Sequence, residues 1–262
     1  MRIAVFLCLT LLARLSFAQG ISDDALKKIQ FDQKLGDSIS LDLPFRDEQG
    51  KPVLLRNYFD KRPVILVLGY YGCPMLCTLV LNGMISGLQD VKLQMGRDYE
   101  VINVSIDPHE TPALAAAKKQ TYVTRFGQPN AAAGWHFLTG NEPAIRKLAN
   151  EVGFNYAYDP TSLQYAHPSG LVILTPSGKI SHYLSGVVFS NPDLTSALTD
   201  ASNAKVGSPI EQLYLLCFHY SPFSGKYSKL ILTVVRGISL CVLFTLIGYV
   251  VIARRRVKFT RG

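Results

Sequence analysis

The sequence predicts an α/β protein in which a mixed sheet is covered by helices on both faces. From Ile39 onward, short apolar runs alternate with segments of helical periodicity. The series ends in an antiparallel hairpin across the turn at 176–179. Alternating strands and helices favour parallel strand pairing, and a closing hairpin adds antiparallel strands, so both directions are expected in one sheet.

The expected elements follow one another along the chain. The continuous apolar run at 63–71 suits a strand buried on both faces, and apolar residues at helical spacing follow at 75–93. The remaining elements are a hairpin around the turn at 47–51, a strand at 99–106, a helix that opens at 111–112, a strand at 135–139, a helix at 142–152, strands at 171–174 and 180–184, and a helix at 192–203. A strand, a cysteine, a turn and a helix in succession form the unit that carries the chemistry of a thioredoxin-like fold, so we predict that fold.

The two ends of the chain have the patterns of targeting and anchoring segments. Residues 1–18 combine Arg2, an apolar run and small residues before position 19, as in a signal peptide. Residues 230–253 are apolar apart from Arg236 and could span a bilayer core, and the basic residues after them would stay cytoplasmic. We therefore expect a signal peptide at 1–18, a thioredoxin-like domain at 19–203, a juxtamembrane linker at 204–229, a single C-terminal transmembrane helix at 230–253 and a basic cytoplasmic tail at 254–262. This topology places the folded domain on the extracytoplasmic, periplasmic side of the cell envelope.

The net charge of +8 reflects this topology. Seven of the 27 Lys and Arg residues lie in the leader and the tail, which leaves 20 against 19 acidic residues in the body. Because the body is nearly neutral, the positive net charge is no sign of nucleic-acid binding, and we expect no nucleic-acid partner.

Cysteine usage indicates a local site rather than a disulfide framework. Cys8 lies in the leader and Cys241 in the expected membrane helix, so the exported part contains Cys73, Cys77 and Cys217. Three cysteines do not form a framework of paired disulfides, and the close pair is better explained as a redox or metal site.

Cys73 and Cys77 lie four positions apart where a strand passes into a helix, so both can face the same side of the first helical turn. The helix N-terminus is expected to make both sulfurs more acidic. Thiolates are soft ligands that copper(I) selects. Disulfide-exchange enzymes usually separate their cysteines by two residues rather than three. The spacing alone leaves open metal ligation, thiol–disulfide exchange and a structural disulfide.

A third metal donor has to come from elsewhere in the chain, and His167 is the candidate. It lies in a loop just before the strand at 171–174, and in a thioredoxin-like fold this loop lies beside the cysteine turn. The other histidines are expected to be exposed or paired with neighbours. Asp107, Cys217 and His219 remain candidates for an accessory role, although a packed juxtamembrane pair is the simpler explanation of Cys217 and His219.

Several segments of the chain resemble the Sco/SenC family of copper chaperones for cytochrome oxidase. They are the strand and Gly-Cys-Pro-Met-Leu-Cys motif at 63–84, the segments at 105–112 and 134–140, and the His167 loop with the residues up to position 180. The resemblance runs in order from about residue 36 to 200. It implies a thioredoxin-like domain that binds copper, as Cu(I) or Cu(II), through Cys73, Cys77 and His167. It also implies delivery of copper to the copper A site of an oxidase subunit, or prior reduction of that site's cysteines.

The chain departs from the family at two places. Thr78 follows the second cysteine where Pro is frequent, and Met75-Leu76 stand where an acidic residue is frequent, which makes the site less acidic. Many relatives are anchored at the N-terminus, whereas this chain is expected to be anchored at its C-terminus.

Two functions from different classes follow. The first is a non-enzymatic copper chaperone whose partners are the copper A-bearing subunit of a cytochrome c oxidase or related membrane oxidase and, through the C-terminal helix, membrane lipid. The alternative is a thiol–disulfide oxidoreductase in which Cys73 attacks and Cys77 resolves.

Overall fold

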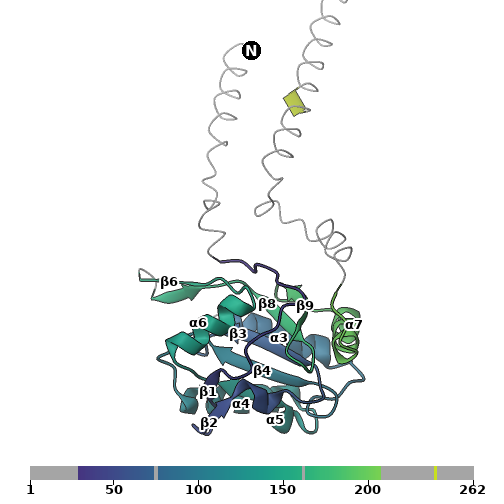
Figure 1. The fold of residues 1–262 in the computed structure, drawn as a ribbon, viewed down its shortest axis with the longest axis horizontal. Helices are drawn as coiled ribbons and strands as arrows, with labels where there is room; N and C mark the ends of the chain where they lie inside the picture. The colour runs from purple at the N-terminus through teal and green to yellow at the C-terminus, as the bar shows by residue number, and fades with distance from the viewer. Residues whose placement is uncertain (1–28, 74–75, 161–162, 208–238, 241–262) are drawn as a thin grey trace, which may run out of the picture. The chain divides into compact units, whose positions relative to one another are not determined.

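The structure is a computed structural model that describes residues 29–73, 76–160, 163–207 and 239–240. A five-stranded mixed sheet forms the centre of its folded domain (Figure 1). Strand β3 pairs in parallel with β4, which pairs in parallel with β5, while β8 is antiparallel to both β3 and β9. The order across the sheet is β5 (Trp135–Leu138), β4 (Glu100–Ser105), β3 (Val64–Gly69), β8 (Gly170–Leu174) and β9 (Ile180–Ser185).

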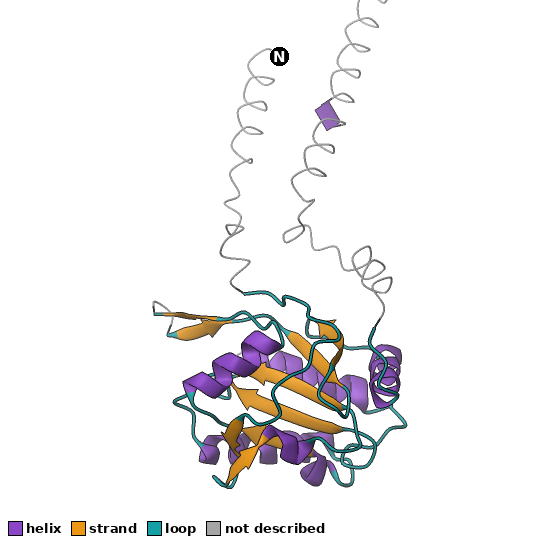
Figure 2. Cartoon of the chain, in the orientation of Figure 1, coloured by secondary structure: helices purple, strands orange, loops and turns teal. Residues whose placement is uncertain are grey.

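The side chains of β3 alternate between two apolar clusters, one on each face of the sheet. Val64, Leu66 and Leu68 belong to the first cluster, and Ile65 and Val67 to the second. Helix α6 (Glu142–Glu151) packs in the first cluster, and α3 (Leu76–Leu88), α4 (Pro112–Phe126) and α7 (Asn191–Ser202) pack in the second (Figure 2). Because β3 is buried on both faces, its sequence is a continuous apolar run. The strand pairing and the helices on both faces confirm the predicted mixed sheet.

Three of these helices begin with the same local chemistry. A Thr, Asn or Ser side chain accepts a hydrogen bond from a backbone amide of the first turn, and a proline follows within two positions. Such caps satisfy amides that have no partner inside the helix. The capping residues are Thr111, Asn141 and Ser190.

The pairing of β3 and β8 brings two segments that are distant in sequence to the same end of the strands. Val64 pairs with Leu174 and Leu66 with Val172, so the chain leaves β3 at the edge where it enters β8. Residues just after Gly69 and just before Gly170 therefore lie close together.

Several short elements complete the described part. The predicted hairpin around 47–51 is present as β1 (Pro44–Arg46) and β2 (Pro52–Leu54), followed by η1 (Leu55–Tyr58), and α5 (Ala131–Gly134) precedes β5. A second hairpin, β6 (Ala157–Asp159) with β7 (Gln164–Ala166), lies where the sequence predicted only a loop.

The predicted terminal segments fall almost entirely outside the described residues. These are the signal peptide at 1–18, the linker from 208 on, the transmembrane helix at 230–253 apart from residues 239–240, and the tail at 254–262. Within the ranges that the structure describes, no helix is both long and apolar enough to cross a bilayer.

Gly83 on α3 should not tolerate a side chain. A Cβ atom at this position would lie 1.9 Å from the carbonyl oxygen of Val187, which is backbone and has little room to move. We expect Gly83→Ala to lower the free energy of unfolding by about 1–3 kcal/mol, despite the better helix propensity of Ala. Ser86→Ala, at an exposed position of the same helix, is the matched control and should change stability little. Equal unfolding midpoints of the two variants in urea would contradict this close packing.

Candidate metal centre

Cys73 and Cys77 lie where β3 passes into α3. Cys73 follows β3 after Tyr70, Tyr71 and Gly72, and its backbone amide donates to the Tyr70 carbonyl at 3.2 Å. Cys77 is in the first turn of α3, and its backbone amide donates to the Cys73 Sγ at 3.5 Å. Cys73 is buried and Cys77 is partly exposed, and the two described thiols are not joined by a disulfide.

Gly69, the last residue of β3, leaves the space that the Cys77 thiol occupies. A Cβ atom at position 69 would lie 2.9 Å from the Cys77 Sγ and 3.7 Å from its Cβ. The glycine therefore lets the helix bring the thiol against the end of the central strand.

His167 lies between β7 and β8, as the sequence predicted, and its ring faces the cysteines. Its Nε2 is 3.3 Å from the Cys77 Sγ, and its Nδ1 is 2.8 Å from the carbonyl oxygen of Pro168. A carbonyl only accepts, so Nδ1 carries the proton in this contact. The neutral ring then presents the lone pair of Nε2 toward Cys77, which is the form in which histidine binds metals.

Aromatic residues hold the imidazole ring in this orientation. The ring stacks on Phe154 with centroids 5.7 Å apart and meets the ring of Tyr70 edge-on at 6.0 Å. Tyr70 also contacts Tyr165 of β7 at 5.5 Å, so the short hairpin contributes to the wall of the site. His167 is only 8% exposed, and rotation of the ring would disturb these contacts.

The potential donor atoms of Cys73, Cys77 and His167 all lie within 4.8 Å of one another. Within the part of the chain that the structure describes, this is the one group of three such residues that could hold a metal ion. Two sulfurs and an imidazole nitrogen suit the soft ion Cu(I), and they also suit Zn²⁺. The structure thus brings together the three residues that the sequence singled out.

The acidity of Cys77 differs from the sequence-based expectation. Its pKa is raised well above the usual range, first by a hydrogen bond with Cys73 and then by burial. The prediction that the helix N-terminus makes both sulfurs more acidic is therefore wrong for Cys77, because it neglected the neighbouring thiol and the loss of solvent. A metal ion that binds Cys77 as a thiolate must displace its proton.

Burial also raises the pKa of Tyr70, and a hydrogen bond between the Tyr70 side chain and Cys73 adds to this effect. Tyr70 therefore stays a neutral phenol beside the cysteines. The sequence predicts Tyr70 only as part of the buried strand, so its place in the site was not foreseen.

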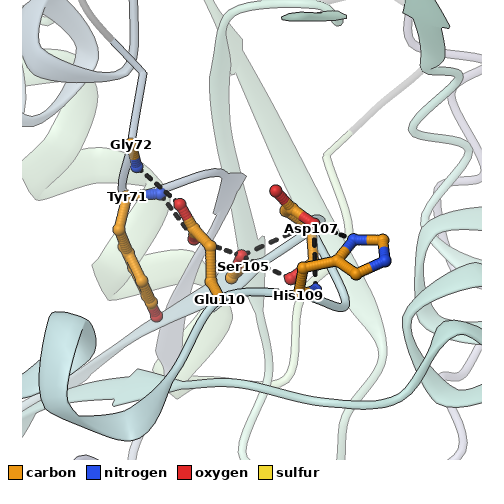
Figure 3. A network of polar contacts seen from close by, with 6 residues as sticks. All are labelled: Tyr71, Gly72, Ser105, Asp107, His109 and Glu110. Atoms are coloured by element: carbon orange, nitrogen blue, oxygen red, sulfur yellow. Dashed lines mark hydrogen bonds and ion pairs between the residues drawn. The ribbon is translucent and has the colours of Figure 1, made fainter. Parts of the chain in front are cut away.

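Glu110 is a second residue whose place beside the site is not apparent from the sequence. Its carboxylate accepts hydrogen bonds from the backbone amides of Tyr71 and Gly72 and from the Ser105 hydroxyl (Figure 3). Burial raises the pKa of this carboxyl, and the hydrogen bonds oppose the rise. An acidic residue just after the Asp107-Pro108 turn was the one hint in the sequence of a role for Glu110. No pattern of side chains reveals that its partners are backbone amides.

The remaining candidates lie outside the three-residue group. Asp107 accepts hydrogen bonds from the amide and the ring Nδ1 of His109, both at 2.9 Å, and the His109 side chain is 86% exposed (Figure 3). His136 lies 3.3 Å from Glu100, as expected of a paired histidine. Cys217 and His219 lie outside the described residues.

Comparisons with known proteins identify a family and related folds. A family model described as SCO1/SenC matches residues 32–201. Among solved structures, a protein from Aquifex aeolicus VF5 is 22% identical with a TM-score of 0.57, over 66% of this chain and 96% of that chain. Arabidopsis thaliana ScoI with copper bound is 18% identical with a TM-score of 0.50, over 65% and 99%.

A third structure, from work on a disulfide switch, is that of BsSco, described as a member of the Sco family of cytochrome c oxidase assembly proteins. It is 20% identical with a TM-score of 0.50, over 66% of this chain and 98% of that chain. At these identities the structural similarities establish a shared, thioredoxin-like fold. No curated protein matches the chain by sequence.

Gly69→Ala tests the contact between the central strand and the Cys77 thiol. We expect it to lower the free energy of unfolding by about 1–3 kcal/mol, because the new methyl group displaces the sulfur. In a Cys77→Ala background the same change should cost little, since the nearest remaining atom is the Cβ at 3.7 Å. The measurement is a double-mutant cycle of urea unfolding, and equal costs in both backgrounds would show that the contact is unimportant.

Proposed function

This chain belongs to the SCO1/SenC family, and on that basis we propose that it is a copper-binding protein whose ligands are Cys73, Cys77 and His167. The observation that supports the assignment best is the convergence of two thiols and one imidazole nitrogen within 4.8 Å. Donor chemistry alone would also admit Zn²⁺, and the family membership favours copper.

We propose further that copper is the cargo of this protein. Cu(I) would be held by two thiolates and the Nε2 of His167, and it would leave by ligand exchange with thiols or imidazoles of a partner. Cys77 is partly exposed whereas Cys73 and His167 are buried, so an incoming ligand has access to the site beside Cys77. The protein provides ligands and orientation and undergoes no net chemical change.

The proposed recipient is the copper A-bearing subunit of a cytochrome c oxidase or a related membrane oxidase. BsSco is described as a member of a family of cytochrome c oxidase assembly proteins, which supports this choice of client. The apolar segment at 230–253 would tether the domain to the extracytoplasmic face of the membrane. Confinement of chaperone and oxidase to one surface would raise their effective concentration.

A second candidate function is supported by the proximity of the two thiols. The Cys77 amide donates to the Cys73 sulfur, which would help to stabilise a Cys73 thiolate. Cys73 would attack a client disulfide, one client thiolate would leave, and Cys77 would then displace the second. The client would gain two electrons, and a separate dithiol reductant would have to reduce the resulting Cys73–Cys77 disulfide.

The role of His167 separates the two functions. We expect His167→Ala to weaken Cu(I) binding on the order of a hundredfold, because it removes one of three donors. Thiol–disulfide exchange should continue in this variant, since both cysteines remain. The measurement is competition of the reduced, full chain with a Cu(I) chelator in the absence of oxygen, repeated with Zn²⁺.

His109→Ala is the matched control, because it removes an exposed imidazole near the site that lies outside the three-residue group. Cys217→Ser should likewise leave binding at this site intact. If His167→Ala binds Cu(I) as tightly as the wild type, the three-ligand copper site is wrong and thiol exchange becomes the better explanation. A large loss of Cu(I) affinity in Cys217→Ser would show that Cys217 contributes to the copper site.

A further inference from the structure

We propose that Glu110 is a positioning residue for the metal centre, which holds Cys73 in place through the backbone of the two residues before it. The proposal rests on the proposed function in one respect, that the pair of cysteines binds a metal. It assigns to Glu110 no direct contact with the metal.

The contacts of the carboxylate are complementary to the backbone it faces. Glu110 Oε2 accepts from the Tyr71 amide at 2.7 Å, and Oε1 accepts from the Gly72 amide at 2.5 Å. The Ser105 hydroxyl donates to Oε2 at 2.5 Å (Figure 3). Hydrogen bonds from neutral donors to a carboxylate are stronger than those between neutral groups. One side chain thus binds two consecutive amides, and Cys73 is the next residue in the chain.

The segment bound by Glu110 is also held at its other side. The Tyr71 hydroxyl shares its proton between two backbone carbonyls, that of Leu138 at 2.8 Å and that of Asn103 at 3.1 Å. These two residues belong to β4 and β5, so Tyr71 is anchored to the sheet through its side chain and to Glu110 through its amide. Little freedom remains for the backbone that leads to Cys73.

Gly72 is the residue that permits this approach. A Cβ atom at position 72 would lie 3.2 Å from Glu110 Oε1, a contact tighter than most side chains make. The φ of Gly72 lies outside the left-handed region, so the backbone angle does not require a glycine here. The close approach of the Glu110 carboxylate does.

These hydrogen bonds explain how the buried Cys73 thiol is kept in place beside Cys77 and His167. Cys73 is 8% exposed, and its sulfur accepts from the Cys77 amide. If the amides of Tyr71 and Gly72 lost their acceptor, the buried Tyr71 amide would need a new partner, and the loop would rearrange to find one. Cys73 would then leave its place beside Cys77 and His167.

The test compares Glu110→Ala and Glu110→Gln with the wild type in the full chain. The first readout needs no metal: the rate at which Cys73 reacts with iodoacetamide, measured by peptide mass spectrometry in a Cys77→Ser background. We expect Glu110→Ala to accelerate the reaction by about tenfold or more, the factor that corresponds to about 1.4 kcal/mol. Glu110→Gln retains one acceptor oxygen and should lie between the other two.

The second readout is Cu(I) affinity with both cysteines present, which should fall in the same order. Glu48→Ala is the matched control for general loss of stability, because Glu48 is a buried carboxylate that contacts Lys119 and the Phe137 amide instead of the cysteine loop. It should leave the alkylation rate of Cys73 within about twofold of the wild type.

Three results would overturn the proposal. The first is an unchanged alkylation rate of Cys73 in Glu110→Ala. The second is an equal acceleration in Glu48→Ala at a matched free energy of unfolding. The third is the same alkylation rate in Glu110→Gln as in Glu110→Ala, which would indicate that the charge of the carboxylate matters rather than its hydrogen bonds. If the wild type binds no copper while the alkylation rates follow the expected order, the proposed function fails, and Glu110 stands as the residue that positions Cys73 but not as part of a metal centre.

Discussion

The pairing of strand β3 with two neighbours of opposite direction is the constraint on which the site depends. Antiparallel pairing with β8 places the start of β8 beside the end of β3, so His167 meets Cys77, which lies 90 residues earlier in the chain. Parallel pairing with β4 aligns Gly69 with Ser105, which brings the loop that contains Glu110 to the same edge. Three loops therefore converge because one apolar strand is buried between two partners, and the ligands need no direct connection in sequence.

The cysteine pair could be identified from the sequence because its chemistry is local. The two thiols are four residues apart at a strand-to-helix transition, and the amide of Cys77 in the first turn of α3 donates to the Cys73 sulfur just before it. His167 required a further step, because only the topology of the predicted sheet brings its loop near the cysteines. The distance of 3.3 Å between Cys77 and His167 follows from strand pairing that no single segment specifies.

Other parts of the site could not be predicted, and each for a physical reason. The hairpin of β6 and β7 has strands of three residues, too short for a clear alternation, and its strands are joined by ring contacts such as Tyr158 with Tyr165 at 5.1 Å. The partners of Glu110 are backbone amides, which have no sequence signature. The acidity of Cys77 was wrongly predicted because the hydrogen bond with Cys73 and the burial of the thiol both raise its pKa, and the burial depends on the tertiary structure.

The orientation of His167 favours a metal carrier over a thiol exchanger. Exchange requires only two cysteines and access to a client disulfide, so a nearby histidine could point in any direction. In this chain, the Pro168 carbonyl fixes the proton on Nδ1, and Phe154 and Tyr70 hold the ring so that Nε2 faces the Cys77 sulfur. The protonated Cys77 thiol donates a weak hydrogen bond to Nε2 at 3.3 Å, so the ring already has a partner in this direction. A metal ion that displaced the thiol proton would meet all three donors in place without rotation of the ring, whereas exchange with a client disulfide makes no use of this orientation.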